Sequence, residues 1–347
     1  MTSTAEVDAV VVGGGIAGAG CLYHLARHGL SAVLLERGSL AGGSTSRSTA
    51  LIETAYADPE RVELCLRTLR LVEELGADFT RCGKLLLGHD ETDIEAFRAA
   101  RHPEASLLAP EEIAAVAPEL RLDGIAGALY APGDGYIDPV LLCGLLVEQS
   151  GLEVRQGTTV RGIARDAGAV TGVSTDDGEI ACRAVVNAAG PWAREVAALA
   201  GLDLDVRGYR RQVAVLEAPP DGLRLPIVVD GALYLRSDGP RHVLAGLHSE
   251  ELADPADPDT FRETTDPAFE QTVARLVAGR LHRGGELTLR GGWVGLYPIA
   301  RGGKPVVGES HELRGFFNLA GLGGNGIQLA PALAEDVAAA VMRCCRG

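Results

Sequence analysis

The stretch VDAVVVGGGIAGAGCLYHLARHGLSAVLLER, residues 7–37, predicts a strand, a glycine turn, a helix and a second strand, in that order. The apolar run before the turn is typical of a buried parallel strand. Three glycines, Gly13, Gly15 and Gly18, follow with the spacing G-x-G-x-x-G, and the second strand ends in an acid, Glu36. We interpret this as a dinucleotide-binding βαβ unit rather than an unrelated glycine-rich turn, because each element lies where that unit requires it.

Each residue of this motif has a mechanical role. Gly13 allows the tight turn, Gly15 lets the backbone approach a pyrophosphate, and Gly18 lets the helix pack on the strand. The pyrophosphate then lies at the helix N-terminus, where free N–H groups and the helix dipole favour anions. Glu36 can accept hydrogen bonds from a ribose diol and disfavours a 2′-phosphate. The motif by itself leaves FAD and NAD open as the bound dinucleotide.

Composition excludes several classes of partner. The chain has 347 residues, 46% of them hydrophobic, which suits two closely joined domains or one large α/β unit. Its formal net charge is −15 with no basic block, so a nucleic-acid or anionic-membrane partner is not expected. No apolar run approaches a membrane span, and we expect no signal peptide before the first strand. The seven cysteines show no metal spacing, so we expect buried thiols, no metal and a cytoplasmic location.

Small-residue segments recur at three further places. Residues 38–56 are small and polar and then turn apolar, as in a segment that runs past a phosphate, or in a surface loop. A strand at 184–187 enters the turn AAGPW and a helix. The glycine loop at 321–326 precedes a C-terminal helix, whose N-terminus can direct N–H groups at negative charge. Elements of a βαβ fold therefore occur at both ends of the chain, and we expect the two ends to meet in one nucleotide domain.

Strand patterns dominate the middle of the chain. Residues 153–186 favour a β-meander, and residues 206–248 are rich in strands, one of which is expected to start at Arg211. Residues 250–260 are acidic and interrupted by prolines, which predicts an exposed loop.

Seven segments, taken in order, resemble the glycine oxidase, sarcosine oxidase and D-amino-acid dehydrogenase group of FAD-dependent oxidoreductases. They are VVVGGGIAGAG with Glu36, GGSTSRSTA, GDGYIDP at 133–139, VVNAAGPW at 185–192, RGYRRQ at 207–212, GLYPIARGGKPVVG at 295–308 and GLGGNGIQLAP at 321–331. The SRSTA run and the GGNGIQ ending are most similar to the branch that resembles D-arginine dehydrogenase. The resemblance implies an α/β fold with a glutathione-reductase-type FAD-binding Rossmann domain and a discontinuous substrate domain, whose antiparallel sheet covers the flavin ring.

The resemblance also implies domain bounds and a cofactor path. Residues 1–80, 136–205 and 290–347 would form the FAD-binding domain, and residues 81–135 and 206–289 the substrate domain. We expect non-covalent FAD, because the cysteine and histidine that attach flavin elsewhere in the family are not at the matching places. Besides Gly13, Gly15, Gly18 and Glu36, the matching cofactor residues are Ile16, Ala17, Arg37, Ser44, Thr45, Ser46, Arg47, Ser48, Thr49, Val160, Ala189, Gly190, Trp192, Gly323, Gly324, Asn325, Gly326 and Ile327.

Three substrate-side candidates come from strands. Tyr297 stands where family members that oxidise amino acids often have an arginine; it would donate a hydrogen bond to substrate or be a core aromatic with a polar tip. Tyr234 matches a substrate-side tyrosine of the arginine dehydrogenase. Arg211 matches its carboxylate-binding arginine, whose planar fork pairs with two carboxylate oxygens; the alternative is an exposed ion pair beside Arg210.

Further candidates depart from the family pattern. Glu53 stands where sarcosine oxidase has a carboxylate-binding arginine; it can bind a cationic amine, although an outward-facing acid on a helix is the favoured interpretation. Lys84 can meet an acidic substrate group, although a surface lysine is favoured. Tyr56 is a further pocket candidate. Leu244 replaces the lysine that activates oxygen in sarcosine oxidase, which slightly favours a dehydrogenase over an oxidase.

The leading hypothesis is a flavoenzyme that oxidises the C–H next to nitrogen in an amino acid or amine, giving an imine that hydrolyses. A second hypothesis is a dehydrogenase of 2-hydroxy acids or other alcohols, which needs a base for the hydroxyl proton. A third is a non-catalytic flavoprotein subunit of a larger assembly. The electron acceptor stays open among oxygen, a quinone and another flavoprotein.

Overall fold

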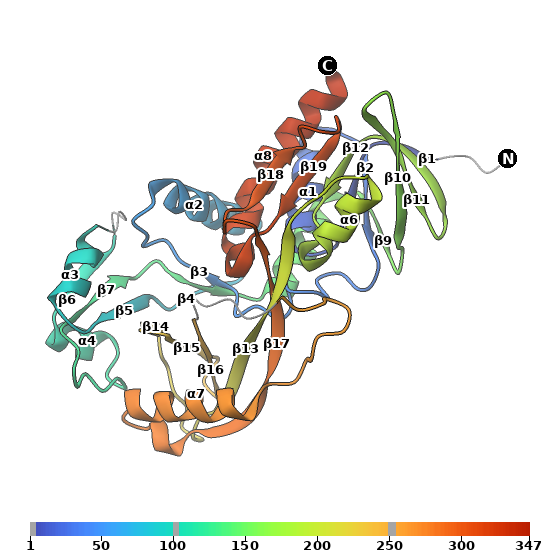
Figure 1. The fold of residues 1–347 in the computed structure, drawn as a ribbon. Helices are drawn as coiled ribbons and strands as arrows, with labels where there is room; N and C mark the ends of the chain where they lie inside the picture. The colour runs from blue at the N-terminus through green and yellow to red at the C-terminus, as the bar shows by residue number, and fades with distance from the viewer. Residues whose placement is uncertain (1–4, 100–103, 249–254) are drawn as a thin grey trace.

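The computed structural model describes residues 5–99, 104–248 and 255–347, and Figure 1 shows how their elements are arranged. Its first sheet has a parallel centre with the strand order β9 (Glu153–Gln156), β2 (Ala32–Glu36), β1 (Ala5–Val12), β12 (Gly178–Asn187) and β19 (Phe316–Ala320). Strand β11 (Ala169–Thr175) pairs antiparallel with the first half of β12, and β10 (Val160–Asp166) pairs antiparallel with β11. Strand β18 (Val306–Glu309) pairs antiparallel with β19. The two ends of the chain therefore meet in one sheet, as expected from the sequence.

Helices bury both faces of this sheet. On one face α1 (Ile16–Arg27), α5 (Pro139–Ser150) and α8 (Gly326–Arg346) pack together, and α2 (Pro59–Glu74) packs against α8. On the other face lies α6 (Ala193–Leu199), which follows the single turn η1 (Gly190–Trp192). Residues 9–12 of β1 are all apolar because both faces of this part of the strand are buried: Val11 faces the first helix layer and Val10 faces the second.

The second sheet forms the other half of the molecule (Figure 1). Its strand order is β17 (Thr288–Ala300), β13 (Val206–Glu217), β16 (His242–Leu247), β15 (Leu233–Asp238), β14 (Ile227–Asp230), β5 (Lys84–Gly88), β7 (Gly127–Ala131) and β6 (Ser106–Leu108). All neighbours are antiparallel except β14 and β5, which run parallel. Helix α7 (Pro267–Arg280) covers one face of this sheet, and α3 (Glu91–Arg98) and α4 (Pro110–Val116) lie near β5 to β7.

Alternation along β13 gives the second sheet two different faces. Ala214 and Leu216 point into the core that contains Val273 and Val277 of α7. The neighbouring residues point the opposite way, because successive side chains of a strand alternate between faces. That opposite face looks towards the first sheet and carries Arg211. A small third sheet of β3 (Leu51–Ile52), β8 (Gly135–Ile137) and β4 (Phe79–Arg81) lies between the two halves.

Three details differ from the sequence expectations. Strand β9 is a parallel neighbour of β2, so the predicted meander begins only at β10. Strand β13 begins at Val206, and Arg211 therefore lies inside a long strand rather than at its start. Strand β17 pairs with β13 along its whole length up to Ala300, and we propose that the domain boundary lies after β17 rather than at 290. In each case, pairing with a strand that is distant in sequence overrides the local pattern of residues.

Two further observations concern the whole chain. Within the described residues no helix combines the length and the apolar character needed to cross a membrane. All seven cysteines are free thiols, five of them buried. Residues 250–254 of the predicted exposed loop lie outside the described residues.

Candidate active site

The glycine turn after β1 brings three backbone segments into contact. Gly13 has a φ of +109°, and a Cβ atom there would lie 2.6 Å from the carbonyl oxygen of Ala188. A Cβ at Gly18 would lie 1.9 Å from the carbonyl oxygen of Gly13, so α1 packs directly on the turn. Gly14, at the unspecified position of the motif between Gly13 and Gly15, donates its N–H to Glu36 Oε2 at 2.6 Å. The turn therefore presents backbone rather than side chains to a ligand.

A cavity of about 730 Å³ extends from this turn to the second sheet. Most residues predicted for the cofactor line it, namely Gly13, Gly15, Ile16, Ala17, Glu36, Arg37, Ser44, Thr45, Arg47, Ser48, Thr49, Val160, Ala189, Gly190, Trp192, Gly323, Gly324, Gly326 and Ile327. Three predicted cofactor residues do not line it. Gly18 packs on Gly13, the Ser46 hydroxyl donates to the Gly43 carbonyl at 3.3 Å, and Asn325 accepts a hydrogen bond from Arg61.

The second sheet holds the small-residue segment that lines the middle of the cavity. The hydroxyl of Ser44 donates to the carbonyl of Leu296 at 2.7 Å. The indole of Trp293 donates to the carbonyl of Arg47 at 2.8 Å, and the guanidinium of Arg236 donates to the carbonyl of Thr49 at 3.0 Å. These contacts hold residues 44–49 between the two halves of the molecule. The alternative interpretation of this segment as a surface loop does not account for them.

The segment 255–263, which precedes α7, contacts residues of the first half of the molecule that line the cavity. Asp259 accepts hydrogen bonds from Arg37 at 2.5 Å and from the Trp192 indole at 2.9 Å, and Arg37 stacks on the Trp192 ring at 4.2 Å. Glu263 pairs with Arg47 at 2.8 Å. The hydrogen bond from Arg37 lowers the pKa of Asp259. Asp259 and Glu263 both line the cavity, and no sequence signal marked them.

The first turn of α8 borders the cavity beside the second sheet. The single turn η3 (Gly323–Asn325) leads into α8, and Gly324, Gly326 and Ile327 line the cavity. A Cβ at Gly324 would lie 2.5 Å from the ring of Tyr297, so the glycine lets this ring lie against the loop. Free N–H groups at the start of α8 give this end of the cavity a positive potential.

Three of the five predicted substrate-side residues line the cavity: Arg211, Tyr234 and Tyr297. The Arg211 guanidinium lies over the Tyr297 ring at 5.5 Å and donates to the carbonyl of Arg210 at 2.9 Å. Among the described residues no carboxylate lies within ion-pair distance of Arg211, whereas Arg210 pairs with Asp266 at 3.3 Å. The alternative of an exposed ion pair therefore describes Arg210 and not Arg211.

The two tyrosines, Tyr234 buried and Tyr297 partly buried, are phenols that keep their protons. Burial raises the pKa of Tyr234 and of Tyr297, so both hydroxyls remain donors at neutral pH. Tyr234 lies across Gly246, where a Cβ would be 2.3 Å from the phenol oxygen. Its ring is also 4.8 Å from the ring of His248.

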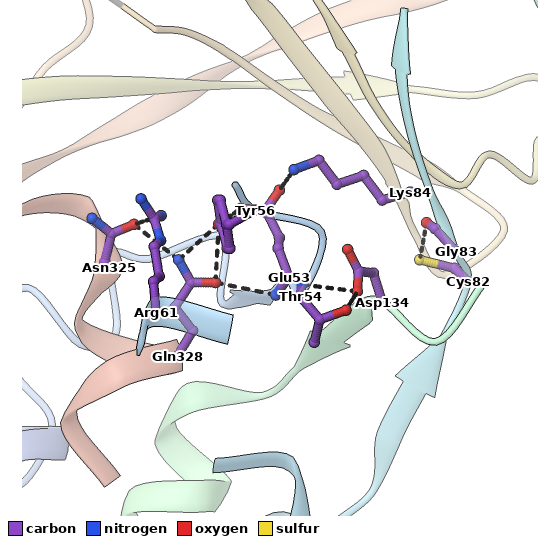
Figure 2. A network of polar contacts seen from close by, with 10 residues as sticks. All are labelled: Glu53, Thr54, Tyr56, Arg61, Cys82, Gly83, Lys84, Asp134, Asn325 and Gln328. Atoms are coloured by element: carbon purple, nitrogen blue, oxygen red, sulfur yellow. Dashed lines mark hydrogen bonds and ion pairs between the residues drawn. The ribbon is translucent and has the colours of Figure 1, made fainter. Parts of the chain in front are cut away.

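Glu53 and Tyr56 do not line the cavity but lie in a polar network beside it (Figure 2). Glu53 Oε1 lies 2.8 Å from Lys84 Nζ, with 15% and 9% of the two side chains exposed. Burial would raise the pKa of Glu53, but the Lys84 ammonium and the Tyr56 hydroxyl hold that pKa below its usual value. The expectations of an outward-facing acid on a helix and of a surface lysine are both wrong, because β3 and β5 bring these two charges together in the interior.

Comparison with known proteins identifies the family. A family model described as "DAO: FAD dependent oxidoreductase" matches residues 8–340. The chain belongs to this family. Human mitochondrial sarcosine dehydrogenase is 30% identical over 97% of the chain, and glycine oxidase of Geobacillus kaustophilus is 28% identical over 94% of the chain and 91% of the relative. The chain spans only about 40% of the length of the first curated relatives that it matches.

Solved structures support the same assignment to the DAO family. L-proline dehydrogenase from P. horikoshii superposes with a TM-score of 0.89 at 26% identity, covering 96% of this chain and 93% of that chain. Glycine oxidase from Geobacillus kaustophilus superposes with a TM-score of 0.85 at 26% identity, covering 98% and 95%. The resemblance seen in the sequence motifs, the fold class and FAD as the cofactor are therefore confirmed.

The cavity of this DAO-family chain fits FAD. The turn at Gly13 leaves room for a pyrophosphate where any side chain would collide with Ala188, and the α1 N-terminus faces it. Arg37 and Arg47 also line the cavity, each paired with an acid, and keep further N–H donors beyond those pairs. Glu36 can still accept from a ribose hydroxyl, since each carboxylate oxygen has more than one lone pair. Sequence reasoning missed Arg61, Arg236, Asp259 and Glu263, because their roles arise from contacts with distant segments.

Proposed function

We propose that this chain oxidises the carbon–nitrogen bond of an amino acid or a related amine and releases an imine that hydrolyses. When bound, FAD supplies the ring position that accepts a hydride from the carbon next to nitrogen. The donor loses that hydride from carbon and a proton from nitrogen. The observation that carries the proposal is Arg211, a cavity-lining guanidinium with no acidic partner among the described residues.

Arg211 is suited to bind the carboxylate of an amino acid. Its guanidinium is always charged and can pair with two carboxylate oxygens at once. Stacking on Tyr297 and the hydrogen bond to the Arg210 carbonyl restrict its orientation, so less freedom is lost when substrate binds. Gly295, directly opposite Arg211 on β17, has no side chain to block the approach.

Tyr234 and Tyr297 would orient the rest of the substrate. Both phenols stay protonated, so they can donate to a carboxylate oxygen or to the lone pair of an amine. An amine that binds in its neutral form needs no base in the cavity before the hydride leaves.

The names of the relatives support an amine or amino-acid substrate. Sarcosine dehydrogenase, glycine oxidase and L-proline dehydrogenase each name an amino acid, and a further relative from Paenarthrobacter nicotinovorans is named 4-methylaminobutanoate oxidase. All four names describe oxidation of a molecule that has both an amine and a carboxylate. We propose the same class of substrate for this chain, with FAD held without a covalent bond.

Anaerobic mixing of the FAD-loaded protein with a panel of D- and L-amino acids, N-methyl amines and 2-hydroxy acids tests this function. We expect loss of the oxidised flavin absorbance with at least one amine that carries a carboxylate. Bleaching by hydroxy acids alone would replace the proposal with an alcohol dehydrogenase. A flavin that no compound of the panel reduces would favour a non-catalytic subunit.

Arg211→Gln tests the role of the guanidinium. We expect KM for the carboxylate substrate to rise by about 10- to 100-fold, the loss that accompanies removal of a charged hydrogen bond, with a smaller change in kcat. Arg210→Gln is the matched control, because the neighbouring guanidinium already pairs with Asp266. An unchanged KM in Arg211→Gln would remove Arg211 from the substrate site.

A further inference from the structure

A chain of hydrogen bonds connects the start of α8 with the buried Glu53–Lys84 pair (Figure 2). It runs through six side chains from four separate segments, in the order Arg61, Asn325, Gln328, Tyr56, Glu53 and Lys84. Neither the proposed substrate contacts nor the glycine motif accounts for its first member, Arg61.

Arg61 is a cation in an unusual place. It lies in the first turn of α2, where the helix dipole disfavours positive charge. Its Nη2 donates to Asn325 Oδ1 at 2.7 Å, and its guanidinium stacks on the Tyr56 ring at 3.6 Å. Its Nε is buried with no hydrogen-bond partner among the described residues. This local cost indicates that the position of the charge serves something other than the stability of α2.

The charge of Arg61 is not neutralised by an acid. Within the described part of the chain no carboxylate lies within ion-pair distance of Arg61, and the acid that its network reaches, Glu53, is already paired with Lys84. The other carboxylate of this region, Asp134, is buried, and burial raises its pKa to about 7. Because Glu53 is paired with Lys84, the network leaves the positive charge of Arg61 without an acidic partner among the described residues.

Through its hydrogen bond to Asn325, Arg61 contacts the segment that lies at the end of the cavity where α8 begins. Asn325, which it holds, is the N-cap residue of α8, and Gly324 and Gly326 on either side line the cavity. This end borders Tyr297 and the second sheet, whereas Glu36 marks the opposite, ribose-binding end. If a dinucleotide is held with its pyrophosphate at the glycine turn, Gly324 and Gly326 would help to hold its flavin half.

We propose that Arg61 is a positioning residue for the flavin, which holds Asn325 and the first turn of α8 at the ring and adds positive charge there. Arg61 and the α8 N-terminus would stabilise the negative charge that bound FAD would gain on reduction. The inference rests on FAD lying in this cavity, as the proposed function also does, but not on the identity of the substrate.

Sulfite provides a test that needs no substrate. It adds through its sulfur lone pair to N5 of oxidised flavin, and the electron pair of the broken ring double bond remains on the ring as negative charge. We expect Arg61→Gln to weaken sulfite binding by about tenfold, as expected for loss of one partly buried charge. A tenfold loss of reduced-state stabilisation corresponds to a two-electron potential about 30 mV lower.

Three variants separate charge from structure. Arg61→Lys keeps the charge and should stay closer to wild type than Arg61→Gln. Asn325→Asp keeps an oxygen acceptor for Arg61 and Gln328 in a side chain of nearly the same shape but adds a negative charge, so it should weaken sulfite binding without loosening the loop. Arg70→Gln, on the exposed side of the same helix, is the control, because Arg70 pairs with Glu63 at 2.7 Å.

The outcomes are distinct. Sulfite affinity and flavin potential that remain at wild-type values in both Arg61→Gln and Asn325→Asp would overturn the inference. If Arg61→Gln purified without FAD, the sulfite affinities of Arg61→Lys and Asn325→Asp would be compared instead. Wild-type affinity in both of these variants would then overturn the inference. A protein that no amine reduces, yet whose sulfite affinity falls in these variants, would contradict the proposed function and leave this inference standing.

Discussion

Lys84 Nζ lies 2.8 Å from Glu53 Oε1 in the interior between the two halves of the molecule, and 9% and 15% of the two side chains are exposed. The lysine begins β5 of the second sheet, and the acid follows β3 of the small third sheet. The pair therefore joins two elements that are not neighbours in any sheet. Removing one partner leaves the other as an unpaired buried charge.

A double-mutant cycle on this pair should show strong coupling. We expect Glu53→Gln and Lys84→Met each to lower the free energy of unfolding by about 3 kcal/mol. The double variant should lose clearly less than the sum, because no charge is then left unpaired. Urea unfolding measures each value, and Arg98→Gln, at an exposed pair with Glu91, should change it by less than about 0.5 kcal/mol. Additive single effects would show that the pair does not act as a unit.

Asp134 should make stability fall as pH rises. Burial raises its pKa from 3.8 to about 7, so between these values the folded state keeps a proton that the unfolded state releases. The cost is complete above about pH 7. Asp134→Asn should therefore gain about 2–3 kcal/mol relative to wild type between pH 5 and pH 8, measured by urea unfolding.

The comparison with wild type is needed because other groups titrate in the same range. Burial lowers the pKa of His24 to about 4, and that group stabilises the protein as pH rises towards 6.5. This opposite contribution is the same in wild type and in Asp134→Asn, so it cancels in the difference. A difference that stays constant from pH 5 to pH 8 would contradict the assignment to Asp134.

Two glycine substitutions should have opposite effects. Gly18→Ala places a Cβ 1.9 Å from the Gly13 carbonyl oxygen, which must displace α1 from the glycine turn after β1. We expect loss of bound FAD and a stability loss on the order of 2–4 kcal/mol. Gly144→Ala, in α5 with nothing within 4 Å of the new Cβ, should instead stabilise by about 0.5–1 kcal/mol. Flavin content and thermal unfolding measure both, and retention of FAD by Gly18→Ala would refute the packing argument.

The contacts of Asp259 and Glu263 should slow the release of FAD. In the double variant Asp259→Asn/Glu263→Gln, Arg37 and Arg47 lose their partners across the cavity, and we expect release about three- to tenfold faster. The rise of flavin fluorescence after dilution measures the rate. Salt should accelerate release in wild type more than in the variant. Asp221→Asn, at an exposed pair with Arg283, should release FAD at the wild-type rate.

The sequence predicted most of the residues that line the glycine-turn end of the cavity, because its signals there are local. The turn at Gly13, Gly15 and Gly18 and the acid Glu36 all lie within one strand–helix–strand unit, so their spacing along the chain determines their arrangement. The candidates for substrate contact could be predicted only through resemblance. Arg211, Tyr234 and Tyr297 come from three strands whose pairing and register are set by the second sheet.

What the sequence by itself determined is the dinucleotide-binding unit, the use of both chain ends in one sheet and a set of candidate side chains. Only the tertiary structure decided which charges are satisfied: Lys84 pairs with Glu53 and Arg210 with Asp266, whereas Arg211 and Arg61 have no acidic partner among the described residues. Charge pairing acts through space over a few ångströms, and in these cases the partners are 31 or more residues apart. Spacing along the chain carries no record of such contacts, and only the folded arrangement of the two sheets creates them.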